Sequence, residues 1–457
     1  MGEKLIISIS GLRGIVGENL TPTIATAYGC AFGSFLKERY GTDERLTVCI
    51  GRDSRPSGSM IAAAVSAGLS GSGIDVIDLG LVTTPSVGIM VRELGCSGGI
   101  VITASHNPLP YNGVKLLLDN GMAPPPDLAA RIRACFKDAD FSLVDSPGCG
   151  TLRTNDHSHR IHVDKVLAIV GVADIQAQRF KVVLDSVNGA GGPAGRMLLD
   201  ALGCNVVAVN SEPTGLFAHA PEPTKENLVS LSDEVIGHQA HIGFAQDPDA
   251  DRLAIVDHQG TYIGEEFTLA LAAQSVMSEQ QGSAAANLST SRMIDDVAAC
   301  FHGEVFRTAV GEANVAAAML EHGCVIGGEG NGGVIDLRVG PIRDSLVGMA
   351  LVLDLMTRTG KSLQELAAGM GAYAMLKDKF RADSDQADQI IKLARATFRE
   401  ATVDTRDGCR FDLTDGWIHL RVSNTEPVMR MIIEANDPGA AQRYAETVLQ
   451  LRDRVFA

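Results

Sequence analysis

The chain has 457 residues, a length that predicts three or four domains. Its hydrophobic share of 45% is typical of a globular protein. Its formal net charge of −16 argues against nucleic acid or an anionic membrane as the main partner. The nine cysteines are scattered and form no C-x-x-C pair, which predicts free, mostly buried thiols. The sequence has neither a signal-like start nor an apolar run near the ~18 residues of a membrane span, so we expect a cytoplasmic protein.

Three regions share one order of elements: a β-rich run, a turn with glycine, a helical stretch, a glycine and a second β-rich run. They begin at Thr47, Lys181 and Glu304, and their helices should end before Gly73, Gly203 and Gly323. This alternation predicts βαβ units in mostly parallel sheets, with each glycine forming a left-handed helix cap. Residues 417–435 instead predict two strands around a polar turn between helical stretches, which favours an α+β module.

We therefore predict an α/β protein with three similar mixed α/β domains and a C-terminal α+β domain. The expected boundaries are 1–153, 154–256, 257–368 and 369–457, with linkers in residues 152–160, near 257–260 and around 367–372.

The first chemical motif is V-I-T-A-S-H-N-P-L-P-Y-N-G-V-K-L, residues 101–116, where Ser105 follows an apolar run and Lys115 comes ten residues later. A hydroxyl in a tight turn at a strand end, with a cation nearby, is placed like a nucleophile. Taken alone, the motif favours the commoner alternative, a serine that caps the next helix. A weaker glycine-rich turn, residues 9–17, carries Arg13.

The second motif, G-F-A-Q-D-P-D-A-D-R-L, places Asp247, Asp249 and Asp251 between two β-like runs. Three close carboxylates repel one another unless a cation lies among them. An EF-hand is excluded because its sixth and twelfth positions are Arg252 and His258 instead of Gly and Glu. An open site with three carboxylates suits Mg²⁺, and the alternative is a solvated acidic loop.

The third motif is C-V-I-G-G-E-G-N-G-G-V-I-D, residues 324–336, in which glycines flank Glu329 and Asn331. Glycines allow a loop to approach a ligand closely, and a carboxylate with an amide can read sugar hydroxyls. The alternative is a glycine-rich hairpin with incidental polar residues.

The fourth motif is H-L-R-V-S-N-T-E-P-V-M-R-M, residues 419–431. Its turn and flanking arginines comprise Arg421, Ser423, Asn424, Thr425 and Arg430. Hydroxyls, backbone N–H groups and guanidinium groups together can hold a phosphate. The alternative is a polar hairpin with two exposed arginines.

A candidate nucleophile, a metal loop, a hydroxyl-reading loop and a phosphate clamp are together what phosphoryl transfer between sugar positions needs. The motifs T-A-S-H-N-P, D-P-D-A-D-R, G-E-G-N-G-G and S-N-T-E-P, in this order, resemble those of the α-D-phosphohexomutase superfamily over essentially the whole chain. This superfamily includes phosphoglucomutases, phosphomannomutases and phosphoglucosamine mutases.

The resemblance implies four domains around a central active-site cleft. It implies a phosphoserine at Ser105, with Mg²⁺ held by Asp247, Asp249, Asp251 and a phosphoserine oxygen, and a hexose 1,6-bisphosphate as intermediate and activator. Lys115 would be the general acid/base, with its pKa lowered by Mg²⁺ and arginines. The other implied roles are electrostatic and positioning for His106, Arg13 and Arg252, sugar reading for Glu329 and Asn331, and phosphate binding for Arg421, Ser423, Asn424, Thr425 and Arg430.

The preferred sugar is predicted to be glucosamine phosphate, since G-E-G-N-G-G, V-G-E-A-N-V and P-E-P-T-K-E-N-L resemble the archaeal-type phosphoglucosamine mutase branch most. Glu312 stands where some relatives place a sugar-contacting histidine, and the superfamily's phosphomannomutase and phosphoglucomutase activities stay open as alternatives. A sugar phosphatase that uses the phosphoserine and a non-catalytic sugar-phosphate sensor are more remote alternatives. The expected partners are small hexose phosphates, with the chain a monomer or homodimer.

Overall fold

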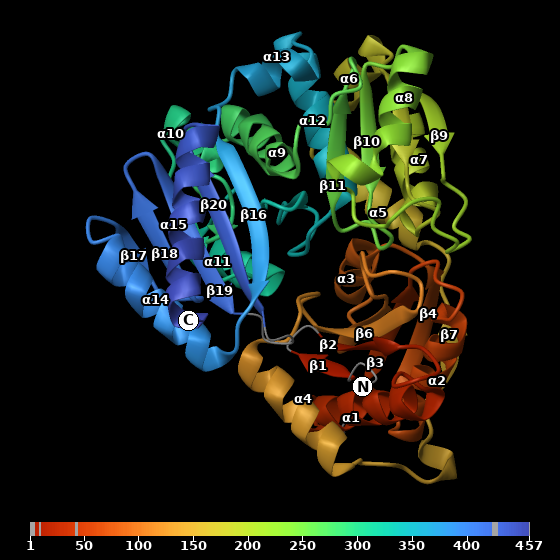
Figure 1. The fold of residues 1–457 in the computed structure, drawn as a ribbon. Helices are drawn as coiled ribbons and strands as arrows, with labels where there is room; N and C mark the ends of the chain where they lie inside the picture. The colour runs from red at the N-terminus through yellow and green to blue at the C-terminus, as the bar shows by residue number, and fades with distance from the viewer. Residues whose placement is uncertain (1–4, 9–10, 42–43, 423–427, 457) are drawn as a thin grey trace.

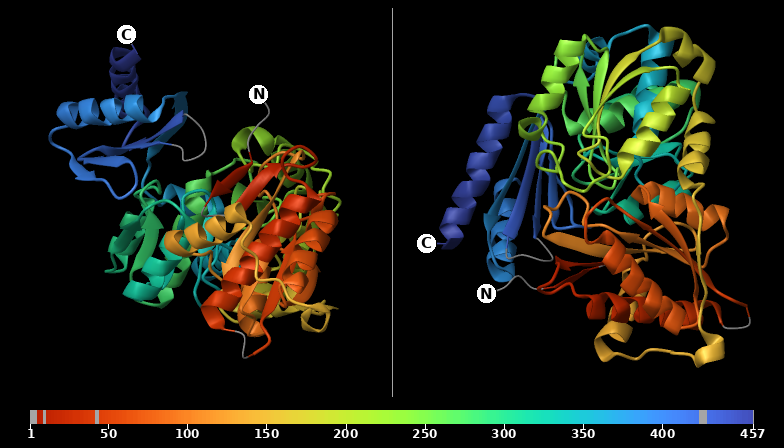
Figure 2. Two further views of the ribbon diagram at one scale, coloured as in Figure 1. Left: turned by 90° about the horizontal axis from the view of Figure 1, so that it is seen from below. Right: turned by 90° about the vertical axis from the view of Figure 1, so that its right-hand side faces the viewer.

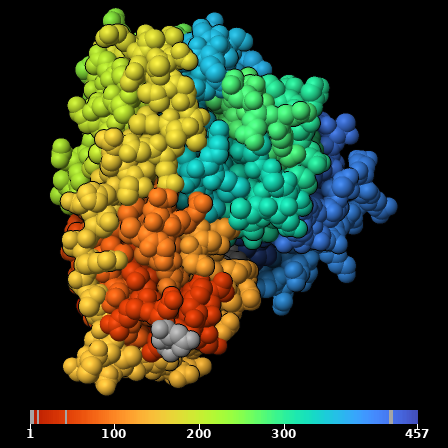
Figure 3. Space-filling model, turned by 180° about the vertical axis from the view of Figure 1, so that it is seen from behind, coloured from red at the N-terminus to blue at the C-terminus, as the bar shows by residue number. Residues whose placement is uncertain are grey.

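The computed structural model describes residues 5–8, 11–41, 44–422 and 428–456. It contains four sheets, which follow one another in the chain and surround a central region where their edges approach (Figure 1). The first three parts form most of the face seen from behind, and the C-terminal part stands at one edge (Figure 3). In the described parts of the chain, no helix is both long and apolar enough to cross a bilayer.

The first sheet is mixed and carries helices on both faces. Its strands, in spatial order, are β1 (Ile6–Ser8), β2 (Gly11–Ile15), β6 (Tyr111–Leu118), β5 (Gly98–Ile102), β3 (Thr47–Arg52), β4 (Asp75–Leu81) and β7 (Leu152–Thr154). From β5 to β7 the strands are parallel, and the other pairings are antiparallel. The helices are α1 (Pro22–Tyr40), α2 (Gly58–Gly71), α3 (Thr84–Glu93) and α4 (Pro126–Asp138), followed by the 3-10 turn η1 (Ser146–Gly148).

Alternation of apolar side chains along the central strands explains the two helical layers. Val48 and Ile50 of β3 pack with α1 and α2, whereas Cys49 between them packs with α3 on the opposite face. This is the period of two that a strand buried on both sides shows.

The second and third sheets have four strands each and share one continuous core. The second has the order β11 (Leu253–Asp257), β10 (Ile242–Gln246), β8 (Lys181–Asp185), β9 (Asn205–Val209), and the third β13 (Val305–Thr308), β12 (Ala284–Asn287), β14 (Ile326–Glu329), β15 (Gly333–Ile335). In each of these sheets three neighbouring strands are parallel, and the fourth strand, β11 or β15, lies at one edge and is antiparallel to its neighbour. Phe244 of β10 and Leu346 of α12 belong to the same buried cluster, so the two sheets are packed through it.

The helices of these two parts follow the strands in βα alternation. They are α5 (Ser158–Leu167), α6 (Val172–Gln178), α7 (Gly191–Ala201), η2 (Lys225–Asn227), α8 (Val229–His238), α9 (Glu265–Glu279), α10 (Met293–Cys300), α11 (Glu312–His322), α12 (Ser345–Thr359) and α13 (Leu363–Ala368). The expected left-handed glycines are present, with φ of 81° at Gly73, 71° at Gly203 and 65° at Gly323.

The C-terminal sheet is antiparallel throughout, with the order β16 (Ala374–Arg381), β20 (Val428–Ala435), β19 (Gly416–Val422), β18 (Cys409–Leu413), β17 (Thr402–Asp404). Helices α14 (Ser384–Thr397) and α15 (Pro438–Phe456) cover one face with their own core. Two further views show this part standing apart from the first sheet (Figure 2).

The predicted fold class is confirmed: three mixed α/β parts precede an α+β part. One linker prediction was wrong, because residues 152–154, expected in a polar linker, form β7 and complete the first sheet by pairing with β4. The cysteines are free as predicted, and five of the nine are buried.

Candidate functional site

All four sequence motifs lie between two consecutive antiparallel strands. The serine loop (residues 103–110) joins β5 to β6, the acidic loop (247–252) joins β10 to β11, and the glycine loop (330–332) joins β14 to β15. The fourth motif joins β19 to β20, and its residues 423–427 lie outside the described part. The first three sheets therefore present their polar residues at connections between antiparallel strands, which face the central region in Figure 1.

Ser105 is buried in the serine loop and contacts the acidic loop. Its side chain is hydrogen-bonded to Asp247 Oδ2 at 3.0 Å, and its Oγ lies 3.4 Å from His106 Nδ1. Its φ of 48° is in the left-handed region, which non-glycine residues seldom adopt. Its N–H donates to Thr103 Oγ1 at 2.8 Å, so the turn stabilises this conformation and directs the hydroxyl at the acidic loop.

Arg55 stabilises the serine loop through hydrogen bonds to its backbone. Its guanidinium donates to four backbone carbonyls of the loop region, those of Ser105, Asn107, Pro108 and Tyr111, at 2.5 to 2.9 Å. It also pairs with buried Asp53 at 3.0 Å, and Asp53 accepts from Thr103 Oγ1 at 2.6 Å. Neither residue is among the predicted site residues, although R-D-S-R at the end of a strand was a usable indication.

The three aspartates of the acidic loop converge as predicted. All are fully buried, and each offers an oxygen within 4.8 Å of the others. Burial and the carboxylates of Asp251 and Asp249 raise the pKa of Asp247 well above its usual value. Burial also acts to raise the pKa of Asp249, but Lys115 and Thr84 outweigh it, and the pKa is lowered. Opposite pKa shifts within one group of three carboxylates indicate that too little positive charge is nearby for all of them to be ionised together.

The donor set of this loop fits a small divalent cation. Asp249 Oδ1 and Asp251 Oδ1 are buried and accept no hydrogen bond from any residue that the structure describes. Buried carboxylate oxygens without donors are costly, and a cation coordinated by oxygen removes that cost. Three carboxylates with room for other oxygens are the ligands that Mg²⁺ uses, so these residues fit the predicted metal.

Two helix starts contact the acidic loop. At α3, Thr84 donates its N–H to Asp249 O at 2.9 Å and its hydroxyl to Asp249 Oδ2 at 2.6 Å. At α12, the hydroxyl of Ser345 donates to Ala250 O at 2.7 Å. The positive end of a helix dipole favours an acidic neighbour, so both contacts suit a loop rich in carboxylates.

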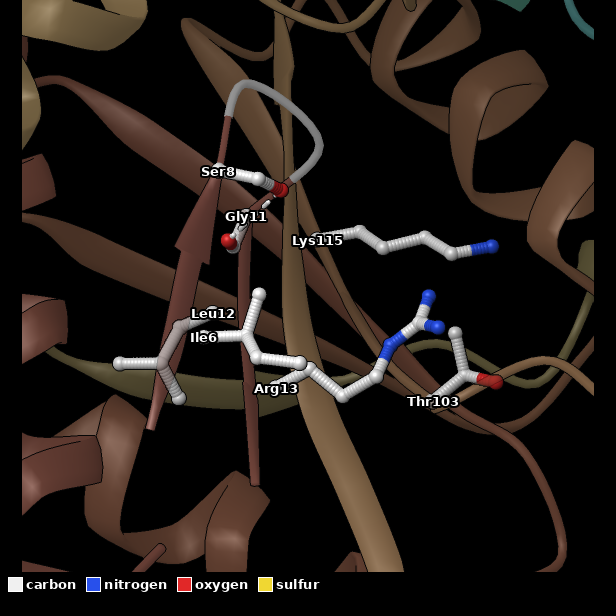
Figure 4. Close-up of a pocket in the computed structure, with 7 residues that line it drawn as sticks. All are labelled: Ile6, Ser8, Gly11, Leu12, Arg13, Thr103 and Lys115. Atoms are coloured by element: carbon white, nitrogen blue, oxygen red, sulfur yellow. Dashed lines mark hydrogen bonds between the residues drawn. The ribbon is translucent and has the colours of Figure 1, made fainter. Parts of the chain in front are cut away.

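Lys115 and Arg13 extend side by side from β6 and β2 and line a cavity of about 120 Å³ next to the serine loop (Figure 4). Lys115 Nζ lies 2.7 Å from Asp249 Oδ2 and 3.7 Å from Asp251 Oδ2. Burial lowers the pKa of Lys115, but the two carboxylates raise it more, so the net direction is upward. The expected lowering is therefore not present in this arrangement, because carboxylates and not arginines are the nearest charges.

Arg13, His106 and Arg252 lie around the same site. Arg13 donates to Asn107 Oδ1 at 2.6 Å, and burial lowers its pKa. Burial, Arg252 and Arg13 lower the pKa of His106 to about 3, so its imidazole is neutral near pH 7. Glu222, from the loop before η2, stands 4.0 Å from His106 and 3.9 Å from Arg252. A segment of the second part of the chain thus reaches the serine loop.

Arg343 connects Glu329, the last residue of β14, to Asp251 in the acidic loop. Asn331 lies two residues after Glu329, in the glycine loop. Arg343 contacts three carboxylates, those of Asp251 and Glu329 at 2.6 Å each and that of Glu312 at 3.1 Å. Asn331 Oδ1 is buried and accepts no hydrogen bond among the described residues, so it has a free acceptor. The sequence analysis missed Arg343, since a single Arg-Asp pair before a helix has no special pattern.

The glycines of this motif serve close packing against the protein itself. A Cβ on Gly330 would lie 1.8 Å from Glu266 Oε2, and one on Gly332, whose φ is 87°, would lie 2.4 Å from Leu253 O. Leu253 N–H donates to Gly332 O at 3.0 Å. The glycines thus bring the glycine loop against β11, which explains them without a ligand.

Arg421 and Arg430 face each other across β19 and β20, with Lys379 of β16 next in the same row. Neighbouring like charges are unfavourable unless an anion is close. Asp407 supplies one, since it accepts from Arg421 Nε at 2.8 and 2.9 Å and from Val310 N–H, beside the glycine loop, at 3.0 Å. The predicted residues Ser423, Asn424 and Thr425 lie outside the described residues.

Comparison with known proteins assigns each part of the chain separately. Residues 5–143, 160–260 and 265–373 match the phosphoglucomutase/phosphomannomutase α/β/α domains I, II and III, and residues 364–451 match the C-terminal domain of the same family. These four matches cover most of the chain in the order of the four sheets.

Whole-length relatives agree with these matches. A "Phosphoglucomutase/phosphomannomutase" of Thermococcus kodakarensis is 39% identical over 98% of both chains. A "Probable phosphoglucosamine mutase" of Methanopyrus kandleri is 35% identical over 97% of this chain and 96% of its own. The crystal structure of a phosphoglucomutase/phosphomannomutase family protein from Burkholderia thailandensis is 29% identical, covers 98% of both chains and superposes with a TM-score of 0.87.

Proposed function

Since this chain belongs to the phosphoglucomutase/phosphomannomutase family, an enzyme family of mutases that move a phosphoryl group within a substrate, we propose that it interconverts hexose 6-phosphate and hexose 1-phosphate through a phosphoserine at Ser105. The observation that carries this proposal is the contact of Ser105 Oγ with Asp247 at 3.0 Å. It joins a hydroxyl from the first sheet to a carboxylate triplet from the second, where a phosphoryl group and a cation can meet.

In the proposed cycle, the phosphoserine gives its phosphoryl group to the free hydroxyl of the bound hexose phosphate. The P–Oγ bond to Ser105 breaks as the new P–O bond forms, and the proton of the sugar hydroxyl finally resides on Oγ. The resulting hexose 1,6-bisphosphate turns over in the site and returns its other phosphoryl group to Ser105. Hexose 1,6-bisphosphate from solution would restore any enzyme that has lost its phosphoserine, and it is therefore the proposed activator.

We assign proton transfer to Lys115, whose Nζ lies beside the acidic loop. Its raised pKa suits the protonated form, which can supply a proton to Oγ as the P–Oγ bond breaks. Arg13, Arg252 and neutral His106 would surround the transferring phosphoryl group with hydrogen-bond donors and positive charge.

Asp247, Asp249 and Asp251 would hold one Mg²⁺, with a phosphoserine oxygen as a further ligand. When bound, Mg²⁺ supplies positive charge at the phosphoryl oxygens. Asp249 Oδ1 and Asp251 Oδ1, which accept no hydrogen bond from the described residues, support this assignment. They are already directed by the chain, since Thr84 holds the other oxygen of Asp249 and Arg343 that of Asp251.

The non-reacting end of the substrate would be bound by the third and fourth sheets. Glu329 and Asn331 are the proposed readers of sugar hydroxyls, and Asn331 Oδ1 has a free acceptor for one. The proposed phosphate ligands are Arg421, Ser423, Asn424, Thr425 and Arg430. The facing positions of Arg421 and Arg430 on β19 and β20 support this role, because two neighbouring guanidinium groups can contact one phosphate.

For the sugar, we propose glucosamine 6-phosphate as the preferred substrate. Its ammonium group would be favoured near Glu312, whose carboxylate at the start of α11 contacts Arg343, as does that of Glu329. The relative from Methanopyrus kandleri carries the corresponding name. The second candidate is phosphomannomutase/phosphoglucomutase activity, favoured by the name of the 39% identical relative. We place the reaction in the cytoplasm, with hexose phosphates as partners and a monomer or homodimer as the working unit.

An isomerisation assay with Mg²⁺ and catalytic bisphosphate tests the proposal on the 1-phosphates of glucose, mannose, glucosamine and N-acetylglucosamine. The highest kcat/KM is expected for glucosamine 1-phosphate, and a tenfold preference for glucose or mannose would select the second candidate. Steady release of inorganic phosphate without isomerisation would replace the mutase by a phosphatase. Full turnover by Ser105→Ala would exclude the phosphoserine, and absence of any turnover would favour a sensor.

A further inference from the structure

A buried chain of polar side chains links three separate parts of the molecule beside the acidic loop. His162 of α5 lies at its centre, with Nδ1 2.8 Å from Ser86 Oγ of α3 and Nε2 2.6 Å from Asp344 Oδ2 at the start of α12. Thr83 Oγ1 continues the chain, 2.8 Å from Ser86 Oγ. The regions that contribute Ser86, His162 and Asp344 match family domains I, II and III respectively.

A neutral imidazole satisfies every group in this chain. Ionised Asp344 accepts only, so Nε2 carries the hydrogen and donates to it, while Asp344 Oδ1 accepts from Leu346 N–H at 2.9 Å and caps α12. The hydroxyl of Ser86 can then donate to Nδ1 and accept from Thr83. Fully satisfied buried networks fix the relative placement of the elements that contribute to them.

This Ser–His–Asp set is not arranged as a second hydrolytic site. Ser86 and His162 are fully buried, and Asp344 is 2% exposed. A nucleophilic serine must reach a substrate, so a set closed to solvent among three packed helices has another role.

The position of the network suggests that role, because it joins the two helix starts that hold the acidic loop. Thr84, between Thr83 and Ser86 in α3, bonds Asp249 through both its N–H and its hydroxyl. On the other side, Arg343 and Ser345 flank Asp344 and contact Asp251 and Ala250. A shift of α3 relative to α12 would therefore change the spacing of Asp249 and Asp251.

We propose that His162 is a positioning residue that locks the start of α3 to the start of α12 and thereby sets the geometry of the carboxylates for Mg²⁺. The residue acts through Thr84 and Arg343, touching neither substrate nor cation. This inference rests on the proposed Mg²⁺ site but not on the identity of the sugar. Removing a residue that hydrogen-bonds to a metal ligand typically weakens metal affinity 10–100-fold. His162 contacts such residues and not the ligands themselves, so its removal should weaken Mg²⁺ affinity by about tenfold or less.

Three variants test the proposal, with Mg²⁺ alone as the probe and isothermal titration of the purified full chain as the readout. His162→Phe keeps the ring volume and removes both hydrogen bonds, and we expect the Kd for Mg²⁺ to rise about tenfold. Ser86→Ala removes one hydrogen bond and should raise the Kd in the same direction by about threefold. His162→Gln can donate to Asp344 and accept from Ser86, and should return the Kd to within about threefold of the unaltered protein.

The matched control is Ser275→Ala, which removes another buried hydroxyl from a helix-to-helix network, with Asp354 and Arg358, away from the acidic loop. Its Kd for Mg²⁺ should be unchanged even if its unfolding temperature falls. A lowered unfolding temperature in His162→Phe with a Kd within twofold of the unaltered protein would overturn the proposal. If that variant does not fold, an unchanged Kd in Ser86→Ala overturns it equally.

Kinetics separate this proposal from the proposed function. For the isomerisation, His162→Phe should need about tenfold more Mg²⁺ for half-maximal rate, while KM for the hexose phosphate at saturating Mg²⁺ stays within twofold. If the unaltered protein isomerises no hexose phosphate but the variants still weaken Mg²⁺ binding as stated, the network role stands and the proposed function fails. An unaltered protein that binds no Mg²⁺ overturns the positioning role itself.

Discussion

Ser105 Oγ lies 3.0 Å from Asp247 Oδ2, although the two residues are 142 positions apart in the chain. The contact joins the hairpin turn of the first sheet to that of the second. It also leaves Ser105 as a hydroxyl facing a carboxylate whose pKa burial raises. The relative placement of the two sheets is therefore a requirement for the proposed chemistry.

Ser105→Ala is expected to lower the isomerisation rate by about 10⁴-fold or more, because no other hydroxyl occupies that place in the serine loop. The unfolding temperature should change little, since Ala keeps the backbone and the donor to Thr103 Oγ1. Rates with glucosamine 1-phosphate and added bisphosphate measure the effect. Ser70→Ala, whose hydroxyl in α2 donates to Gly150 O in the loop before β7, is the control and should keep its rate. Comparable losses in both variants would contradict the role of Ser105.

Added Mg²⁺ should raise the unfolding temperature, because a ligand that binds only the folded state stabilises it by about 2.7 kcal/mol at 100 times its Kd. EDTA should remove both this increase and the activity. Asp249→Asn should lose most of the increase, since it removes the negative charge at one of the two carboxylates whose Oδ1 accepts no hydrogen bond from the described residues. Thermal unfolding followed by circular dichroism gives the measurement, and an equal increase in Asp249→Asn would place the cation elsewhere.

These two predictions concern residues that the sequence identified, and the reason is local. Ser105 and the aspartates lie in hairpin turns and Glu329 ends the strand before one, so their spacing and flanking apolar runs carry the information. Arg55 and Arg343 have no such pattern, because they act through partners brought close only by tertiary packing. The direction of the Lys115 pKa likewise depends on which charges lie nearest in space. The three βαβ regions and the strands β19 and β20 were predicted from apolar runs, but β7 was not, since its three exposed residues show no apolar alternation.

Arg343→Lys should lower kcat/KM by about 10²-fold, because one ammonium cannot contact Asp251, Glu329 and Glu312 together. The loss of guanidinium contacts from these buried carboxylates, above all from Asp251, should also destabilise the protein by about 3 kcal/mol. Steady-state kinetics and thermal unfolding check the two effects. Arg338→Lys, whose guanidinium contacts only Asp336 among the described residues, is the matched control. Equal effects in the two variants would show that Arg343 has no special role.

Stability should fall between about pH 4.5 and pH 7 because of Glu266, which lies against the glycine loop. Burial raises the pKa of Glu266 to about 7 from a usual value of 4.5, although Lys377 opposes this. The folded state therefore binds the proton more tightly, and this stabilisation is complete below pH 4.5 and lost as the pH rises through 7. The loss is about 3 kcal/mol. In Glu266→Gln the unfolding temperature should depend less on pH between pH 5 and 8. In Glu265→Gln, which changes the other carboxylate beside Lys377, the pH dependence of the unfolding temperature should stay as in the unaltered protein.

Asp407→Asn is expected to raise KM about tenfold with little change in kcat, because Asp407 orients Arg421 through two hydrogen bonds to its Nε. A group that binds the non-reacting phosphate contributes equally to ground state and transition state, so its misplacement weakens binding without slowing the chemical step. The KM for hexose 1,6-bisphosphate should rise in parallel, since it uses the same clamp. Asp404→Asn removes a similar pairing with exposed Arg406 and should leave both values unchanged. A fall in kcat with unaltered KM would instead place Asp407, through Val310, in control of the glycine loop.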